Sequence, residues 1–140
     1  MDIKDIVESL IHKYHTRDPY DLAGFLRIRI SRHELGNIRG YYLKKYRVKQ
    51  ILLNNNLNSR EEKFVLAHEI GHSVMHPNIN APFLKERTLI TVSKFEVAAN
   101  KFAVELLIPN EVLLENWQLT IEQLSRLTGY SEALIKLRLQ

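Results

Sequence analysis

The chain has 140 residues, of which 45% are hydrophobic and none is cysteine, and its formal net charge is +4. This length and apolar content suffice for one domain with a buried core, and they exclude a disulfide-stapled scaffold and a cysteine-based zinc site. The charged start Asp2-Ile3-Lys4-Asp5 predicts no secretory signal, and no apolar stretch of the sequence is long enough to span a bilayer. We therefore expect a cytoplasmic protein that does not contact a membrane.

The first quarter of the chain predicts two helices. Apolar residues at helical spacing indicate a helix over residues 2–14, which ends before Asp18 because the residue preceding a proline avoids the helical region. A second, short helix is expected to begin at Pro19.

Three strands are expected next, because apolar and polar side chains alternate over residues 25–31, 41–46 and 48–54. Gly36, Asn37 and Gly40 indicate turns between the first strand and the second. The second and third strands are close enough in the chain to form an antiparallel ribbon.

The segment that carries the chemistry is His68-Glu69-Ile70-Gly71-His72. It follows the capping-box sequence Ser59-Arg60-Glu61-Glu62 and lies in a mostly apolar run, so we expect it on a helix. On a helix, His68 and His72 share one face and can converge on one ion, while Glu69 stands between them as a general base. This H-E-x-x-H spacing is typical of zinc metallopeptidases.

A catalytic zinc site needs a third protein ligand. Asn78 stands where the metzincin pattern would place a histidine, so we expect a carboxylate instead, and Glu96 on a second predicted helix offers one. Asn100 lies one turn further on the same face and can hydrogen-bond a ligand histidine. The competing interpretation is a capping box with Ser93, in which the Glu96 side chain would fold back onto the helix start.

These motifs together resemble those of the ImmA/IrrE family of gluzincin-type metallopeptidases. The resemblance covers about half of the chain and rests on His68-Glu-Ile-Gly-His72 and on Glu96-x-x-Ala99-Asn100-x-Phe102-Ala103-x-x-Leu106-Leu107-Ile108-Pro109. One departure is Ala98, where many members carry Glu or Gln.

The resemblance implies one Zn²⁺ held by His68, His72 and Glu96, with Glu69 as the catalytic base. It also implies a phage or other mobile-element origin and a role as an anti-repressor that cleaves a helix-turn-helix transcriptional repressor. In gluzincin-like enzymes an edge strand before the metal-binding helix holds the substrate, so residues 48–53 are expected to be either that edge strand or a purely structural one.

The expected fold is α+β, with a small antiparallel sheet packed against a metal-binding helix pair in a minimal zincin-like domain over residues 1–109. Residues 110–140 are expected to add a C-terminal helical hairpin packed on that domain. Its first helix is capped by Thr120 and ended by Gly129, and Ser131 starts the second. The hairpin is similar to a DNA-binding helix-turn-helix, but its second helix offers Lys136 and Arg138 alone as cations, so packing is favoured over DNA binding.

Further residues are weaker candidates for the site. His76 lies one turn beyond His72 and could contact a substrate carbonyl oxygen or satisfy the last carbonyls of its helix. Tyr41, Tyr42 and His33 are possible oxyanion partners that the sequence does not rank. Residues 77–91 are expected to form a loop near the site.

Two groups of cations are expected to coat a solvated face, so direct binding of nucleic acid is not the favoured interpretation. The groups are Arg27, Arg29 and Arg32, and Lys44, Lys45, Arg47 and Lys49. The sequence thus predicts a zinc-dependent endopeptidase whose partner is a repressor protein. The alternative is a non-catalytic regulator, stabilised by zinc, that binds a repressor or DNA.

Overall fold

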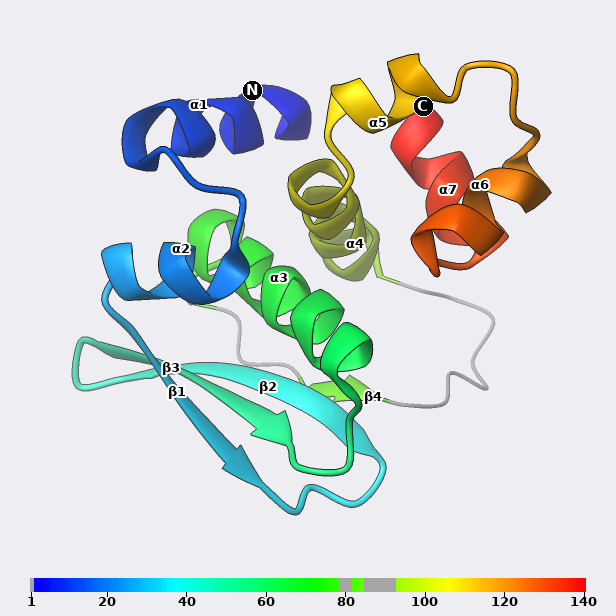
Figure 1. Cartoon of the computed structure of the whole chain (residues 1–140). Helices are drawn as coiled ribbons and strands as arrows, with labels where there is room; N and C mark the ends of the chain where they lie inside the picture. The colour runs from blue at the N-terminus through cyan, green and yellow to red at the C-terminus, as the bar shows by residue number, and fades with distance from the viewer. Residues whose placement is uncertain (1, 79–81, 85–92) are drawn as a thin grey trace.

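The computed structural model describes residues 2–78, 82–84 and 93–140, and these residues confirm the predicted α+β fold. The helices are α1 (Ile3–Tyr14), α2 (Pro19–Phe25), α3 (Ser59–Met75), α4 (Lys94–Leu107), α5 (Asn110–Glu115), α6 (Ile121–Thr128) and α7 (Glu132–Leu139). The strands are β1 (Ile28–His33), β2 (Ile38–Lys45), β3 (Val48–Asn54) and β4 (Pro82–Leu84). Figure 1 shows α3 lying across one face of the sheet, with α4 beside it and α5, α6 and α7 beyond α4.

The sheet has the strand order β1-β3-β2-β4 and is mixed, not antiparallel as the sequence predicted. The antiparallel ribbon of β2 and β3 is confirmed, and its two-residue turn places Tyr46 and Arg47 at φ values of 52° and 65°, as a type I′ turn requires. β1, however, pairs with β3 in parallel. The reason is that the hairpin reverses the chain after β2, so β3 runs in the same direction as β1.

The expectation that residues 48–53 form a substrate-binding edge strand is wrong. β3 is central, because Ile51 pairs with Ile30 of β1 on one side and with Tyr42 of β2 on the other. Its backbone hydrogen-bonding groups are therefore already used on both sides. Among the described strands, β1 and β4 lie at the edges of the sheet.

One part of the core lies between the sheet and α3, and the rest lies between α3 and the other helices. Ile51 and Leu53 of β3 and Tyr42 of β2 are fully buried, and so are Val65 and Ile70 of α3. These strand residues alternate along their strands and therefore share one face of the sheet, which is the face that α3 covers. The metal-binding motif is thereby anchored on a helix that is held by the core.

Gly40 was predicted to mark a turn, but it lies inside β2, under α3. A Cβ atom on Gly40 would lie 2.5 Å from Cγ1 of Val65, so any side chain here would push the helix away from the sheet. The turn that precedes β2 instead contains Gly36, which has a φ of +60°.

α3 begins one residue earlier than its predicted capping box. Asn58 is the N-cap and exchanges hydrogen bonds with Glu61, at 2.9 and 3.1 Å. Glu62, which the prediction assigned to the box, instead accepts hydrogen bonds from Tyr20 of α2 and Arg32 of β1, both at 2.7 Å. Asn and Ser are both good caps, and the contacts of Glu62 with distant elements decide between the two registers.

α4 packs closely against α3 next to the motif. A Cβ atom on Gly71 would lie 3.1 Å from three atoms of the Phe102 side chain, which is fully buried. The glycine therefore permits a close approach of the two helices at the level of the histidines.

Residues 110–140 form three helices, which are the predicted pair α6 and α7 and, before them, α5. α6 and α7 form the predicted hairpin, with a Thr120 capping box and Gly129 at a φ of +82°. Arg138 of α7 is buried, and its guanidinium donates hydrogen bonds to the Ile108 carbonyl (2.8 Å) and to Asn110 (2.6 Å). One of the two cations considered for DNA binding thus contributes to packing.

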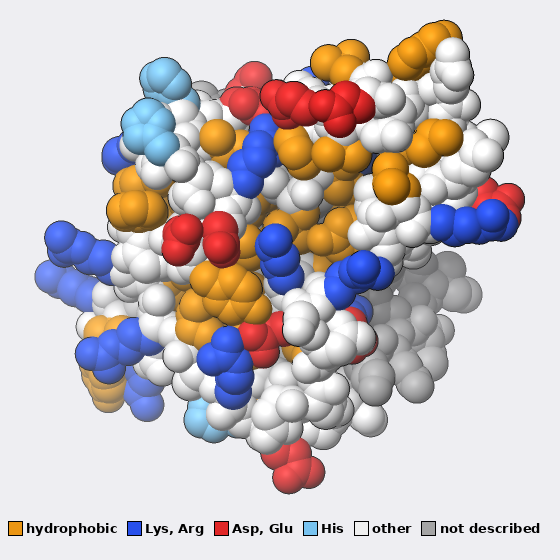
Figure 2. Space-filling view, viewed as in Figure 1, with side chains coloured by type: hydrophobic (Ala, Val, Ile, Leu, Met, Phe, Trp, Pro, Cys, Tyr) orange, Lys and Arg blue, Asp and Glu red, His pale blue; other side chains and the backbone are white. Residues whose placement is uncertain are grey.

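The cations of the strands are exposed at one end of the sheet. Arg27, Arg29, Lys44, Lys45 and Arg47 are exposed, and Figure 2 shows Lys and Arg side chains gathered along the edge of the molecule where the β2 to β3 turn lies in Figure 1. Arg32 forms an ion pair with Glu62.

Candidate metal centre

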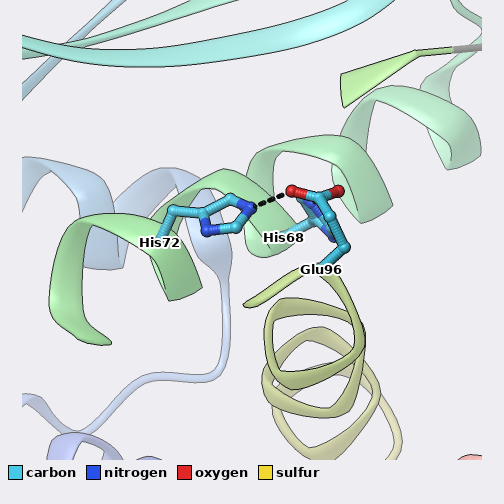
Figure 3. Close-up of side chains that lie close together, drawn as sticks. All are labelled: His68, His72 and Glu96. Carbon is cyan, nitrogen blue, oxygen red and sulfur yellow. Dashed lines mark hydrogen bonds and ion pairs between the residues drawn. The ribbon is translucent and has the colours of Figure 1, made fainter. Parts of the chain in front are cut away.

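His68, His72 and Glu96 meet in a buried cluster between α3 and α4 (Figure 3). Nε2 of His68 lies 3.2 Å from Oε2 of Glu96, and Nε2 of His72 lies 2.7 Å from Oε1 of the same carboxylate. The ligand atoms of the three residues all lie within 4.8 Å of one another. The structure thus brings together the three residues that the sequence predicted as metal ligands.

Both helices position these side chains through local geometry. The four-residue spacing places the two imidazoles on one face of α3, where they meet edge to face with ring centroids 4.8 Å apart. Glu96 lies in the first turn of α4, whose N-cap Ser93 accepts a hydrogen bond from the Glu96 backbone N–H. The Glu96 carboxylate faces the histidines, so it does not complete the capping box with Ser93.

The electrostatics of the cluster favour the protonation states that a metal ion needs. Burial lowers the pKa of His68, which keeps its imidazole neutral. Burial on its own raises the pKa of Glu96, but hydrogen bonds with His68 and His72 outweigh burial and hold that pKa far below its usual range. Neutral imidazole nitrogens and an ionised carboxylate are the forms that coordinate divalent metals.

Asn100 makes the contact expected of it. Nδ1 of His68 donates a hydrogen bond to Oδ1 of Asn100 at 2.8 Å, from the next turn of α4. With its proton on Nδ1, His68 presents the lone pair of Nε2 to the centre of the cluster.

Glu69 lies beside the cluster and is fully buried. Its Oε2 atom is 3.9 Å from Nε2 of His68. The carboxylate therefore stands next to the nitrogen that faces the cluster, while it belongs to the same helix as both histidines.

The weaker candidates occupy different places. The Tyr42 hydroxyl lies in the core and donates a hydrogen bond to the Pro77 carbonyl at 3.0 Å, and Tyr41, the next residue on β2, points to the opposite face of the sheet. His33 is exposed on β1, where Nε2 lies 2.9 Å from the Ser31 hydroxyl. The predicted loop 77–91 lies largely outside the described residues, and its described residues 82–84 form β4.

His76 lies closest to the ligands among these candidates. Its Nδ1 atom is 3.2 Å from Nδ1 of His72, and its ring packs edge-on against Phe95 with centroids 4.7 Å apart. Burial lowers the pKa of His76, and the neighbouring His72 lowers it further. Phe95 was not among the residues predicted from the sequence, although its place directly before Glu96 puts it at the start of α4.

The cluster fits a divalent transition-metal ion. Two imidazole nitrogens and one carboxylate form a donor set that such ions accept, and each of the three residues is at least nine-tenths buried. On the face shown in Figure 2, no histidine side chain of the described chain is visible over the middle of α3 and α4, in agreement with this burial.

An H-E-x-x-H helix packed on a small sheet, with a glutamate supplied by the following helix, defines a domain of the metallopeptidase class. The chain belongs to the ImmA/IrrE family, because residues 25–140 match the family model Peptidase_M78, described as the IrrE N-terminal-like domain. The resemblance seen in the sequence is thereby confirmed.

Two relatives extend this finding. The chain is 43% identical over 139 residues to "Uncharacterized immunity region protein 2" of Bacillus phage phi105, an alignment that spans 97% of this chain and 88% of the relative. It is 30% identical over 113 residues to "Metallopeptidase ImmA" of Bacillus subtilis strain 168, spanning 81% of this chain and 67% of the relative. In the part of the chain that the structure describes, no helix has the length and apolar character needed to cross a membrane.

Proposed function

We propose that this protein is a zinc-dependent endopeptidase that inactivates a helix-turn-helix transcriptional repressor by cleaving it. The observation that carries the proposal is the convergence of His68, His72 and the Glu96 carboxylate in one buried cluster, with Glu69 beside it. A family of peptidases and a relative named as a metallopeptidase support the same reaction class.

In this proposal His68, His72 and Glu96 hold the Zn²⁺ ion, and Asn100 fixes the ring of His68. When bound, the ion supplies Lewis-acid chemistry, which polarises the scissile carbonyl and makes a water molecule more acidic. The same donor set would accept Mn²⁺, Co²⁺ or Ni²⁺, so geometry and availability decide the metal.

Glu69 carries the proton in the reaction. Its carboxylate accepts a proton from the attacking water and then donates that proton to the amine that leaves, so the carboxylate is regenerated in each cycle. Burial suits this role, because charges that develop during the reaction interact more strongly where water is excluded. Tyr41 points to the face of the sheet opposite α3, and the Tyr42 hydroxyl is already bonded to the Pro77 carbonyl, so the proposal assigns neither tyrosine to the substrate.

The proposed partner is a protein and not a nucleic acid. One relative is named for an immunity region and comes from a phage, and the other is named as a metallopeptidase, which supports a peptidase of a phage or other mobile element. Action on a regulatory protein in the cytoplasm is part of the proposal. The burial of Arg138 supports residues 110–140 as a helical unit that packs on a peptidase domain formed by residues 1–109.

The proposal predicts metal-dependent cleavage of the repressor. We expect the purified protein to convert a helix-turn-helix repressor from the same phage or host into two defined fragments. Treatment with a chelator should abolish the fragments, and added Zn²⁺ should restore them. Intact-mass spectrometry of the mixture checks this result, and fragments that persist undiminished after complete removal of the metal would contradict it.

A further inference from the structure

A histidine that binds a metal through one ring nitrogen is oriented by the partner of its other nitrogen. Asn100 is that partner for His68, at 2.8 Å. For His72 the atom within hydrogen-bonding distance is Nδ1 of His76, at 3.2 Å. We propose that His76 is a positioning residue, which holds the imidazole of His72 with Nε2 turned toward the metal; this inference rests on the proposed metal site.

A metal ion bound at Nε2 of His72 would fix the direction of this hydrogen bond. The proton of the neutral His72 ring would then be on Nδ1, and Nδ1–H would donate to the lone pair on Nδ1 of His76, whose own proton would be on Nε2. Nε2 of His72, which lies 2.7 Å from Oε1 of Glu96, would then carry no proton and would present its lone pair to the ion. His72 thereby acquires the same tautomer that Asn100 imposes on His68.

The backbone explains how His76 reaches this place. It is the C-cap of α3, one turn after His72, and its backbone N–H donates to the His72 carbonyl at 2.7 Å. At a φ of −134° and a ψ of 55° the residue leaves the helical conformation while its ring stays beside that of His72.

A second helix fixes the His76 ring. Phe95 packs edge-on against it at 4.7 Å and directly precedes Glu96 on α4. The contact between His72 and His76 is thus held by the same two helices that supply the ligands. Because Nδ1 of His76 lies within hydrogen-bonding distance of His72, the geometry connects His76 to a proposed ligand. The sequence had suggested contact either with a substrate carbonyl oxygen or with the last carbonyls of the helix.

Two substitutions separate the hydrogen bond from the packing. His76→Phe keeps an aromatic ring against Phe95 but removes the acceptor. His76→Asn removes the ring but places an amide oxygen at the position of Nδ1 along the side chain. We expect His76→Phe to raise the Kd for Zn²⁺ about 10- to 100-fold, and His76→Asn to stay close to the wild-type value.

The Kd is measured by competition with a zinc chelator, and thermal melting of each metal-free variant reports its folding. The absorption spectrum of the Co²⁺-loaded protein is a second readout, which should change in His76→Phe and be retained in His76→Asn. Asn100→Ala serves as the reference, because it should weaken binding through His68.

The proposal is overturned if neither His76 variant changes the Kd, or if His76→Phe binds like the wild type while His76→Asn binds weakly. The latter result would show that zinc affinity depends on the packing of an aromatic ring against Phe95 and not on a hydrogen-bond acceptor for His72. A wild-type protein that binds Zn²⁺ but leaves the repressor intact would instead refute the proposed peptidase function, since zinc affinity is measured without cleavage.

Discussion

Glu69→Gln should reduce the rate of repressor cleavage about 100- to 10,000-fold and leave the zinc content of the protein unchanged. The amide has almost the same shape as the carboxylate but cannot accept the proton of the attacking water. Glu69 is fully buried, 3.9 Å from the nearest ligand nitrogen, so a substitution that preserves volume should disturb the packing little. Single-turnover cleavage assays together with metal analysis measure both quantities.

This variant also decides between the enzyme and the alternative, in which the zinc-stabilised protein regulates by binding alone. Glu115→Gln is the matched control, because it makes the same chemical change on the exposed end of α5 and should leave cleavage unaffected. If Glu69→Gln relieved repression as fully as the wild type, binding alone would explain the biological effect and the catalytic account would be wrong.

Arg138→Ala should lower the free energy of unfolding by about 3–5 kcal/mol. Arg138 is 5% exposed and its ion-pair partner Glu105 is 2% exposed, with Nη1 of the arginine 3.4 Å from the carboxylate. Its Nε and Nη2 atoms also donate to the Ile108 carbonyl and to Asn110. Alanine would leave the buried Ile108 carbonyl and the half-buried Asn110 without this donor, although Lys101 would still pair with the buried Glu105 at 3.0 Å.

Urea unfolding of both proteins measures this difference. Arg126→Ala is the control, because Arg126 is 74% exposed and pairs with Glu122 on the surface of α6. Exposed pairs of this kind contribute about 0.5 kcal/mol or less. Equal losses in the two variants would show that the buried network at the junction of α4 and α7 does not stabilise the fold as we argue.

The sequence was most informative where the relevant geometry is local. The four-residue spacings of His68 and His72, and of Glu96 and Asn100, fix which side chains share a helix face. The need for a third ligand then connected the two helices, although residues 76–93 separate them in the chain. The structure shows the contact between Asn100 and His68 that this reasoning expected.

The sequence alone did not predict which distant segments of the chain contact one another. The alternation in residues 48–54 indicates a strand with one buried face, but it does not say which strands pair with it, and β3 proved central. Arg138 was considered as a cation for DNA, because nothing near it in the chain reveals that Glu105, Ile108 and Asn110 meet it in space. Gly40 likewise appeared to be a turn residue, since its contact with Val65 depends on how α3 crosses the sheet.

The most direct test of the metal centre is the zinc content of Glu96→Ala beside that of the wild type. The substitution should leave α4 intact, because the N-cap contact at Ser93 uses the Glu96 backbone N–H and not its side chain. We expect the purified wild type to contain one zinc ion per chain and the variant to lose it during dialysis against a weak chelator. Full zinc content in Glu96→Ala would contradict the account, because the ion would then be held without the carboxylate that faces both histidines.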